Sequence, residues 1–400
     1  MMKKKKCLLL GVILFASSQF LFAQNYDVNY DESKVGTYSL PELLITQSGE
    51  KVSTVKQWEK VRRPEILKLF ENNEYGKVPS DFDKITFKIE NQDNNAMEGL
   101  ATLKQVAVTV FRNNNSLTIH LVLFIPNKVK KEVPVFLVIN HRGMRTMDVT
   151  RNNKDGFWPA EQVISAGYAI AGFDVTDVSP DNNKTFSKGV LDQLYPEQLK
   201  MNNGMRCLGA WGWGASRIID YFETDKAIDA KKIIVLGHSR GGKASLWCGA
   251  QDQRIAITIS NESGNSGAAL SRRNFGETID KIMIASRWFC PNYRKYANNE
   301  DKLPFDQHML IALIAPRAVY VATAADDLWG DSKGQYLGLK YAQPVYNLYG
   351  CNCNLPEGMP DASTFICSAM GFHNRVGKHN MTPYDWQQFI RFANNYFKEK

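Results

Sequence analysis

The sequence IIVLGHSRGGK, from Ile233 to Lys243, decides the fold of this chain. Its first four residues are branched and apolar, which is typical of a buried parallel strand. Gly237 and Gly241 then flank Ser239 at the G-x-S-x-G spacing, because a nucleophile on a tight strand-to-helix turn leaves no room for a Cβ two residues before or after it. We therefore predict a strand, a sharp turn at the serine, and a helix that continues through Lys243.

The predicted turn gives Ser239 a chemical role. It lifts the hydroxyl out of the sheet to the start of a helix, where backbone N–H groups and the helix dipole can stabilise an oxyanion. A serine hydroxyl is a weak nucleophile at neutral pH, so it needs a base, and the base needs an orienting acid. In chains with this turn, the order along the sequence is serine, acid, histidine.

Three histidines follow the serine, and they differ in context. His308 lies at the start of an apolar helix, so we interpret it as structural. His373 and His379 are both expected in the loop before the last helix, where the base belongs. We favour His379, because it directly precedes the predicted helix start at Thr382.

Two acids compete for the third position. Glu262 follows the predicted strand at 255–260, and Asp327 follows the predicted strand at 319–323, which is the usual position of the acid. Either carboxylate could merely cap a loop, and both could reach one imidazole. The sequence leaves this choice open.

The order of the predicted elements indicates the fold class. From residue 133 onward strands alternate with helices, which predicts an α/β-hydrolase fold with a mostly parallel central sheet between two layers of helices. The loop His141-Arg142-Gly143 after the strand at 133–140 is a candidate for a second oxyanion donor. Strands are expected at 85–89, 105–111, 117–125, 133–140, 168–173, 233–236, 255–260, 319–323 and 344–349, with a hairpin turn at 113–115, helices at 55–74 (with a kink or restart at Pro64), 158–166, 209–222 and 382–398, and a surface insertion at 174–202.

The N-terminus predicts export. Four lysines precede a mostly apolar run that ends at Ala23, the pattern of a cleaved secretory signal, and polar residues within the run argue against a membrane span. We therefore expect a signal peptide at 1–23, an N-terminal arm and helix at 24–80, and the catalytic domain at 81–400. The mature protein is expected to be secreted or periplasmic, off the membrane, and monomeric.

Charge and cysteine content exclude other classes. Subtracting the four lysines of the leader from the formal charge of +8 leaves +4, and no basic stripe with interleaved aromatic residues is present, so we expect no nucleic-acid partner. Six of the seven cysteines follow the leader; their pairing stays open, because six cysteines allow fifteen pairings. No CxxC or HxxxH spacing accompanies them, so we predict no metal site. The predicted serine mechanism needs no organic cofactor either.

Several ordered motifs resemble the glucuronoyl esterases, carbohydrate esterases of the α/β-hydrolase fold. The resemblance runs from about residue 58 to the last helix and is densest between 233 and 386. The motifs are GHSRGGK at 237–243, NESG at 261–264, LSRRNFGE at 270–277, RWFCPNY at 287–293, LPFDQH at 303–308 and DLW at 327–329.

The resemblance implies roles for individual residues. It implies a triad of Ser239, Glu262 and His379, with Asp327 as a second acid in bacterial members, and an oxyanion role for Arg240. It further implies that the uronic acid sugar is bound by three residues: Lys243, Glu277 and Trp329. The chain departs from the family at Asn380, where many relatives have aspartate and which we expect not to touch the triad, and at Arg287, where histidine is frequent.

The chemistry of these side chains suits a sugar ester. Arg240 offers a positive charge where a tetrahedral intermediate becomes negative. Lys243 and Glu277 can bond sugar hydroxyls, and Trp329 offers a flat face for a pyranose ring. The alternatives are that Lys243 is a solvated helix charge and that Trp329 belongs to the core; Arg272 and Arg273 are expected to be structural.

The sequence thus predicts a serine esterase that cleaves 4-O-methyl-glucuronoyl esters linking glucuronoxylan to lignin alcohols, through a covalent acyl-enzyme. An acetyl or feruloyl xylan esterase is the alternative within enzymes. A catalytically inactive carbohydrate-binding homologue is the alternative outside them.

Overall fold

The computed structural model describes residues 28–351 and 353–398, so the predicted signal peptide at 1–23 lies outside the described residues. Within them, ten strands form one sheet in the order β1-β2-β3-β5-β4-β6-β7-β8-β10-β9. The strands are β1 (Lys84–Ala96), β2 (Ala101–Arg112), β3 (Asn115–Pro126), β4 (Val133–Asn140), β5 (Ala169–Asp174), β6 (Ile228–His238), β7 (Ile255–Asn261), β8 (Ala318–Ala324), β9 (Phe365–Ile366) and β10 (Met370–Arg375).

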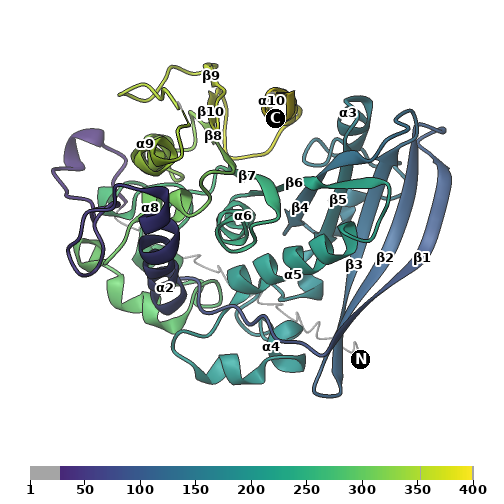
Figure 1. Ribbon diagram of the computed structural model, residues 1–400, viewed down its shortest axis with the longest axis horizontal. Helices are drawn as coiled ribbons and strands as arrows, with labels where there is room; N and C mark the ends of the chain where they lie inside the picture. The colour runs from purple at the N-terminus through teal and green to yellow at the C-terminus, as the bar shows by residue number, and fades with distance from the viewer. Residues whose placement is uncertain (1–27, 352, 399–400) are drawn as a thin grey trace, which may run out of the picture.

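Helices cover both faces of this sheet, which confirms the expected three-layer α/β class (Figure 1). One face carries α3 and α10, and the other carries α5, α6, α8 and α9, with α2 packed outside α8. The helices are α1 (Val55–Gln57), α2 (Arg63–Asn73), α3 (Ala160–Ser165), α4 (Val190–Gln193), α5 (Cys207–Phe222), α6 (Arg240–Gln251), α7 (Ile279–Ile282), α8 (Gln307–Ala312), α9 (Ser332–Leu348) and α10 (Pro383–Lys398).

The apolar run of β6 shows why the sheet is buried on both faces. Successive side chains of a strand point to opposite faces. Ile233 and Val235 therefore join the core beneath α5 and α6, whereas Ile234 and Leu236 join the core beneath α3 and α10. A strand that is apolar at every position thus serves two cores at once, and its carboxyl end lies at the middle of the sheet.

The antiparallel part of the sheet comes first in the chain. β1, β2 and β3 form a meander, and the register Arg112↔Asn115 leaves Asn113 and Asn114 as a two-residue turn. Both have positive φ, 52° and 64°, which asparagine tolerates and which this tight turn requires. The predicted hairpin is confirmed, and β3 then pairs antiparallel with β5.

The structure differs from two expectations for the C-terminal third: a strand at 344–349, and a loop that holds His373. The segment 344–349, expected as a strand, falls mostly within α9, whose buried residues Tyr336, Leu339, Ala342 and Val345 recur at helical spacing. The missing strand is β10, which pairs parallel with β8. Its polar side chains hid it from a search for apolar runs, although all six of its residues are buried.

The segment 174–202 is also not the surface insertion that its polarity predicts. It holds the short helix α4 and buries apolar side chains against α5 and the sheet, among them Val178, Leu191 and Tyr195. These few large residues anchor the segment, while the polar residues between them form turns. Asp181 of this segment pairs with Arg240 at the start of α6, so part of the segment lies beside the carboxyl end of β6.

The N-terminal part packs on the main body through specific contacts. The expected helix at 55–74 is α1, one π-helical stretch and α2, with Pro64 in the first turn of α2. Proline has no backbone N–H to donate, and the π-helical stretch Trp58–Arg62 ends directly before α2, so the regular α-helical pattern starts afresh at Arg63. The division at residue 80 between arm and catalytic domain stays a prediction.

Candidate active site

The turn after β6 holds Ser239 in a strained backbone conformation. Its φ is 54° and its ψ is −127°, and it directly precedes α6. A Cβ on Gly237 would lie 2.1 Å from the carbonyl oxygen of Gly241, and one on Gly241 would lie 3.0 Å from the carbonyl oxygen of Ile139. Both glycines of the motif are therefore sterically required, and the half-buried serine sits at the helix N-terminus as expected.

His379 lies beside this turn, although 140 positions separate it from the serine in the sequence. Its ring centroid is 4.5 Å from that of His238, the residue before Ser239. Its Nδ1 is 2.7 Å from Asp327 Oδ2 and 3.2 Å from Glu262 Oε2. The structure thus brings all four predicted residues to one place, and because Nδ1 faces the carboxylates, Nε2 is the nitrogen left to exchange a proton.

The two acids control the charge of this imidazole. Burial disfavours its protonated form, but the hydrogen bonds and charges of Asp327 and Glu262 outweigh burial and raise the pKa of His379 to about 9. A base held this firmly as a cation must lose its proton before it can accept one from a hydroxyl. The site is therefore predicted to gain activity as the pH rises.

The acids are held differently. Asp327 gives one oxygen to His379 and accepts the N–H of Gly330 with the other. Glu262, in a left-handed backbone conformation with φ 47°, accepts Arg375 at 2.6 Å and the backbone N–H of Asn380 at 2.8 Å. Burial is the largest influence on Glu262 and raises its pKa despite these partners. Asp327 is the acid nearer to His379, and Glu262 has more hydrogen-bond donors other than the imidazole.

His373 does not lie in the loop where we expected it. It is a fully buried residue of β10, with Nε2 at 2.9 Å from Asp385 and Nδ1 at 2.8 Å from the Tyr320 hydroxyl. Asp385 also accepts Arg375, which reaches Glu262 with its other nitrogen. His373 is thus part of a buried ion network behind the site, and His379 stays the predicted base.

His308 has a structural role, as expected. It is buried in α8 with Nε2 at 3.2 Å from the carbonyl oxygen of Pro41, and burial lowers its pKa to about 4. Arg272 and Arg273 are structural as well, because they bond Asp306, Asp331 and loop carbonyls.

In the loop after β4, one of the expected oxyanion donors is already occupied. The N–H of Arg142 donates to the side chain of Asn140, so it is not available to a substrate oxygen. Arg142 instead reaches the side chain of Asn380 at 2.8 Å. Our expectation that Asn380 does not touch the triad holds for its side chain and is wrong for its backbone N–H, which binds Glu262.

Arg240 is the remaining candidate donor, and it is tied down on one side only. Its Nη1 donates to Asp181 at 2.6 Å, and its guanidinium carbon lies 4.8 Å from the ring centre of Trp288. Its Nε is buried and has no hydrogen-bond partner among the described residues. Sequence reasoning missed Asp181, because it lies in a polar stretch without a motif. The one signal that could have marked it is that the sequence gives this acidic residue no other role.

The predicted sugar-binding residues are neighbours, but the ammonium of Lys243 already has hydrogen-bond partners within the protein. It is buried and donates to the carbonyl oxygens of Ser263 and Asn265 and to Glu277 Oε2 at 2.6 Å. These are all the donors an ammonium has, so Lys243 can act on a sugar only by holding Glu277. Trp329 is 39% exposed, not core, and its carbonyl accepts the N–H of Glu277.

One group of described residues has the spacing of a metal site. Ligand atoms of His238, Glu262 and His379 lie within 4.8 Å of one another. The Glu262 carboxylate in this group is already bonded by Arg375 and the Asn380 N–H. We assign no metal here, and metal-free chemistry stays a prediction.

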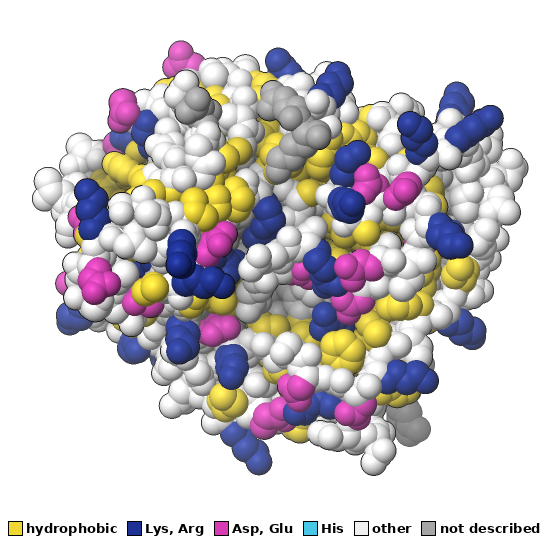
Figure 2. Space-filling view, viewed as in Figure 1, with side chains coloured by type: hydrophobic (Ala, Val, Ile, Leu, Met, Phe, Trp, Pro, Cys, Tyr) yellow, Lys and Arg dark blue, Asp and Glu magenta, His cyan; other side chains and the backbone are white. Residues whose placement is uncertain are grey.

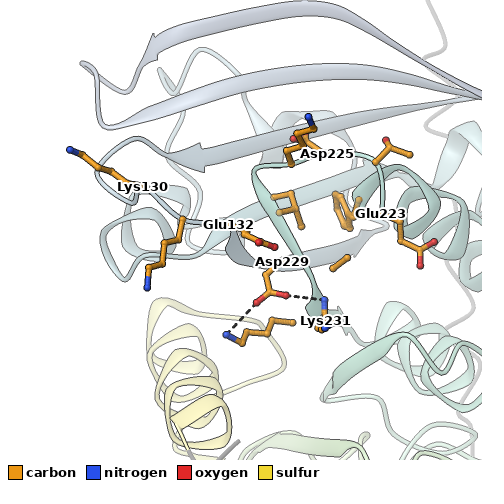
Figure 3. Close-up of a pocket in the computed structure, with 13 residues that line it drawn as sticks. Lys130, Glu132, Glu223, Asp225, Asp229 and Lys231 are labelled. Carbon is orange, nitrogen blue, oxygen red and sulfur yellow. Dashed lines mark hydrogen bonds and ion pairs between the residues drawn. The ribbon is translucent and has the colours of Figure 1, made fainter.

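A large pocket lies far from this site. It has a volume of about 920 Å³ and surrounds the amino end of β6, whereas Ser239 follows the carboxyl end (Figure 3). Lysines and acids line it together, and Asp229 pairs with Lys232 at 3.2 Å. Figure 2 likewise shows basic and acidic side chains interspersed over the visible face. None of the helices within the described residues is long and apolar enough to cross a bilayer.

Comparison with known proteins identifies the family of this chain. The family model described as "Glucuronyl esterase, fungi" matches residues 108–350. A carbohydrate esterase named MZ0003, from an unknown prokaryotic organism, is 38% identical over an alignment that covers 98% of both chains. A 4-O-methyl-glucuronoyl methylesterase of Schizophyllum commune is 26% identical over 87% of this chain and 82% of that protein.

Solved structures give the same result. A promiscuous CE15 esterase from the marine bacterial metagenome has a TM-score of 0.84 at 38% identity and covers 92% of this chain and 100% of its own. A glucuronoyl esterase from Solibacter usitatus has a TM-score of 0.84 at 36% identity, with coverage of 91% and 100%. Fold and site thus define a carboxylic ester hydrolase of the α/β-hydrolase class. Within that class, the chain belongs to the glucuronoyl esterase family.

Proposed function

We propose that this protein hydrolyses 4-O-methyl-glucuronoyl esters, the links between glucuronoxylan and lignin alcohols, as a secreted or periplasmic monomer. The observation that carries the proposal is the contact of His379 with Asp327, at 2.7 Å, beside the strained turn at Ser239. Support for the substrate comes from relatives named 4-O-methyl-glucuronoyl methylesterases.

In the proposed reaction Ser239 Oγ attacks the ester carbonyl carbon while His379 Nε2 takes its proton. The carbon–oxygen bond to the alcohol then breaks, His379 returns the proton to the leaving oxygen, and a glucuronoyl-serine ester remains. Water, deprotonated by the same imidazole, attacks the carbonyl carbon of that ester; the bond to Ser239 Oγ breaks, the imidazolium returns its proton to Oγ, and the uronic acid is freed. Asp327 keeps the imidazole in the tautomer that leaves Nε2 unprotonated.

Arg240 would stabilise the negative oxygen that forms in both steps. Its charge and its partly exposed side chain suit that task, since a fixed cation in a half-buried site needs little reorganisation at the moment of reaction. Glu277, held by Lys243, would accept a sugar hydroxyl with its second oxygen. The exposed ring of Trp329 would pack on the pyranose.

A panel of esters tests the proposal. The benzyl ester of glucuronic acid should be hydrolysed, and acetylated xylan and a feruloyl arabinoside should be turned over at least tenfold more slowly. Preference for either of the last two would make the protein an acetyl or feruloyl esterase instead. Absence of turnover on all three, with intact folding, would point to an inactive binding protein and contradict the proposal.

A further inference from the structure

Asp181 stands at the centre of a four-residue cluster that borders the site, which we call the Arg240 clamp: Asp181, Arg240, Arg287 and Trp288. The Asp181 carboxylate accepts hydrogen bonds from Arg240 Nη1 and Arg287 Nε, each at 2.6 Å, and from Trp288 Nε1 at 2.8 Å. Three elements far apart in the sequence thus meet on one carboxylate. Its side chain is only 16% exposed, so water competes little for these bonds.

The ring of Trp288 adds a second constraint on the same cation. The guanidinium carbons of Arg240 and Arg287 lie 4.8 and 5.4 Å from its centre, within the range of a cation–π contact. The guanidinium of Arg240 is therefore held at Nη1 by Asp181 and across its planar face by the ring of Trp288. Its buried Nε is left without a partner among the described residues.

Charge balance explains the second arginine. A carboxylate paired with Arg240 alone would cancel the charge that an oxyanion needs. Here Arg287 offsets Asp181, so the clamp of two cations and one anion keeps one positive charge. Burial alone would raise the pKa of Asp181, but the bonds from Trp288 and Arg240 and the charges of both arginines lower it, so the carboxylate stays ionised at neutral pH.

We infer that Asp181 is a positioning residue, which holds the Arg240 guanidinium in the orientation in which its charge faces the oxyanion, while Arg287 preserves the net charge of the clamp. The inference rests on the proposed function. An unrestrained arginine loses side-chain entropy when it is fixed. A clamp that fixes it beforehand removes that cost from the transition state, where preorganised donors have their effect.

Kinetics of Asp181→Asn in two backgrounds test the inference. In the otherwise native protein, kcat for the glucuronate benzyl ester should fall about 10- to 100-fold, with KM changed less than about threefold, because the lost interaction acts only in the transition state. In the Arg240→Gln background, the same substitution should change kcat less than about twofold, since its effect passes through Arg240. Asp192→Asn, an exposed aspartate of the same segment, is the control and should match the native rate.

Each other outcome counts against the clamp. Equal losses in both backgrounds would make Asp181 merely structural, and an unchanged kcat in the native background would overturn the inference outright. If Asp181→Asn does not fold, Trp288→Phe decides, because it removes one bond to Asp181 and keeps a ring; its loss of kcat should again vanish in the Arg240→Gln background. Should the native protein cleave no glucuronate ester at all, the proposed function fails instead.

Discussion

At the scale of single residues, the site depends on one imidazole between two carboxylates. Asp327 is the nearer acid, and Glu262 has two other donors besides His379. An acid that already serves Arg375 and the Asn380 N–H has less freedom to follow the imidazole as its charge changes. Asp327 is therefore the better candidate for the orienting acid, and Glu262 for the group that fixes the loop.

We expect Asp327→Asn to lower kcat/KM by about 10³- to 10⁴-fold, because an amide no longer enforces the productive imidazole tautomer. Glu262→Gln should cost less than about 10²-fold. Comparison of the two variants in one ester assay decides the assignment that the sequence left open. A larger loss for Glu262→Gln would reverse it.

The pH dependence follows from the same contacts. The pKa of His379 is raised to about 9, and the base works only when unprotonated, so kcat/KM of the native protein should rise between pH 6 and 9. Glu262→Gln removes a partner that favours the cation and should move this rise to lower pH. A pH–rate profile measures both, and a profile that is already flat from pH 6 would contradict the assigned charge state.

Residue types at the site could be predicted, but partners often could not. Ser239, His379 and both acids could be predicted because each follows a strand or precedes a helix at a recognisable place. Lys243 could not be recognised as buried, because its acceptors are backbone carbonyls of a distant loop. Asp181 and Arg375 were missed for the same reason, since only the folded chain brings their partners together.

At the scale of elements, the turn between β6 and α6 is fixed by lack of space. We expect Gly237→Ala to lower the melting temperature and to abolish ester hydrolysis, since the new methyl would lie 2.1 Å from a backbone oxygen that cannot move without distorting the turn. Gly358→Ala is the matched control, because nothing lies within 4 Å of its Cβ position. Thermal unfolding and activity are measured together, and a fully active, stable Gly237→Ala protein would disprove the steric argument.

The junction of β10 with α10 depends on Arg375. This side chain bridges Asp385 and Glu262 inside the protein, so Arg375→Met would remove the guanidinium that these two buried carboxylates share. We expect a loss of about 3–5 kcal/mol in the free energy of unfolding, as when one partner of a buried ion pair is removed. Denaturant unfolding is the measurement.

Arg391→Met on α10 serves as the control for this substitution. Arg391 is exposed and lies over the ring of Phe365, a contact worth about 0.5–1 kcal/mol. If the two variants lose equal stability, the buried network has no special weight.

Strand prediction succeeded or failed with the polarity of each strand. β4, β6, β7 and β8 were located because they are apolar runs, whereas β10 carries His373, Asn374 and Arg375 into the sheet. Such a strand is stable only because Asp385, Tyr320 and Glu262 satisfy its polar groups. No local pattern announces those partners, so this element could not be found from the sequence.

At the scale of the whole molecule, two cores share one sheet, and α10 closes one of them. Trp386 on α10 is fully buried, packs on Phe136 of β4 at 5.5 Å, and donates to the carbonyl oxygen of Phe157. The helix that follows the candidate base is thereby fixed to the middle of the sheet. The class and layer order of the fold could be predicted from the alternation of strands and helices alone.

We expect Trp386→Ala to lower the free energy of unfolding by about 3–5 kcal/mol, the usual cost of a large cavity. Trp329→Ala removes the same ring from an exposed position and should cost less than about 1 kcal/mol. Denaturant unfolding compares them. Similar losses would mean that α10 is not fixed by this ring.

The account depends most on Ser239 being the nucleophile that His379 activates. The most direct measurement is mass spectrometry after reaction with an organophosphonate ester, which traps the nucleophile of a serine esterase. The account predicts one adduct per chain, on the peptide that contains Ser239, formed much more slowly in His379→Asn and not formed in Ser239→Ala. An adduct on another residue, or undiminished labelling of Ser239→Ala, would contradict it.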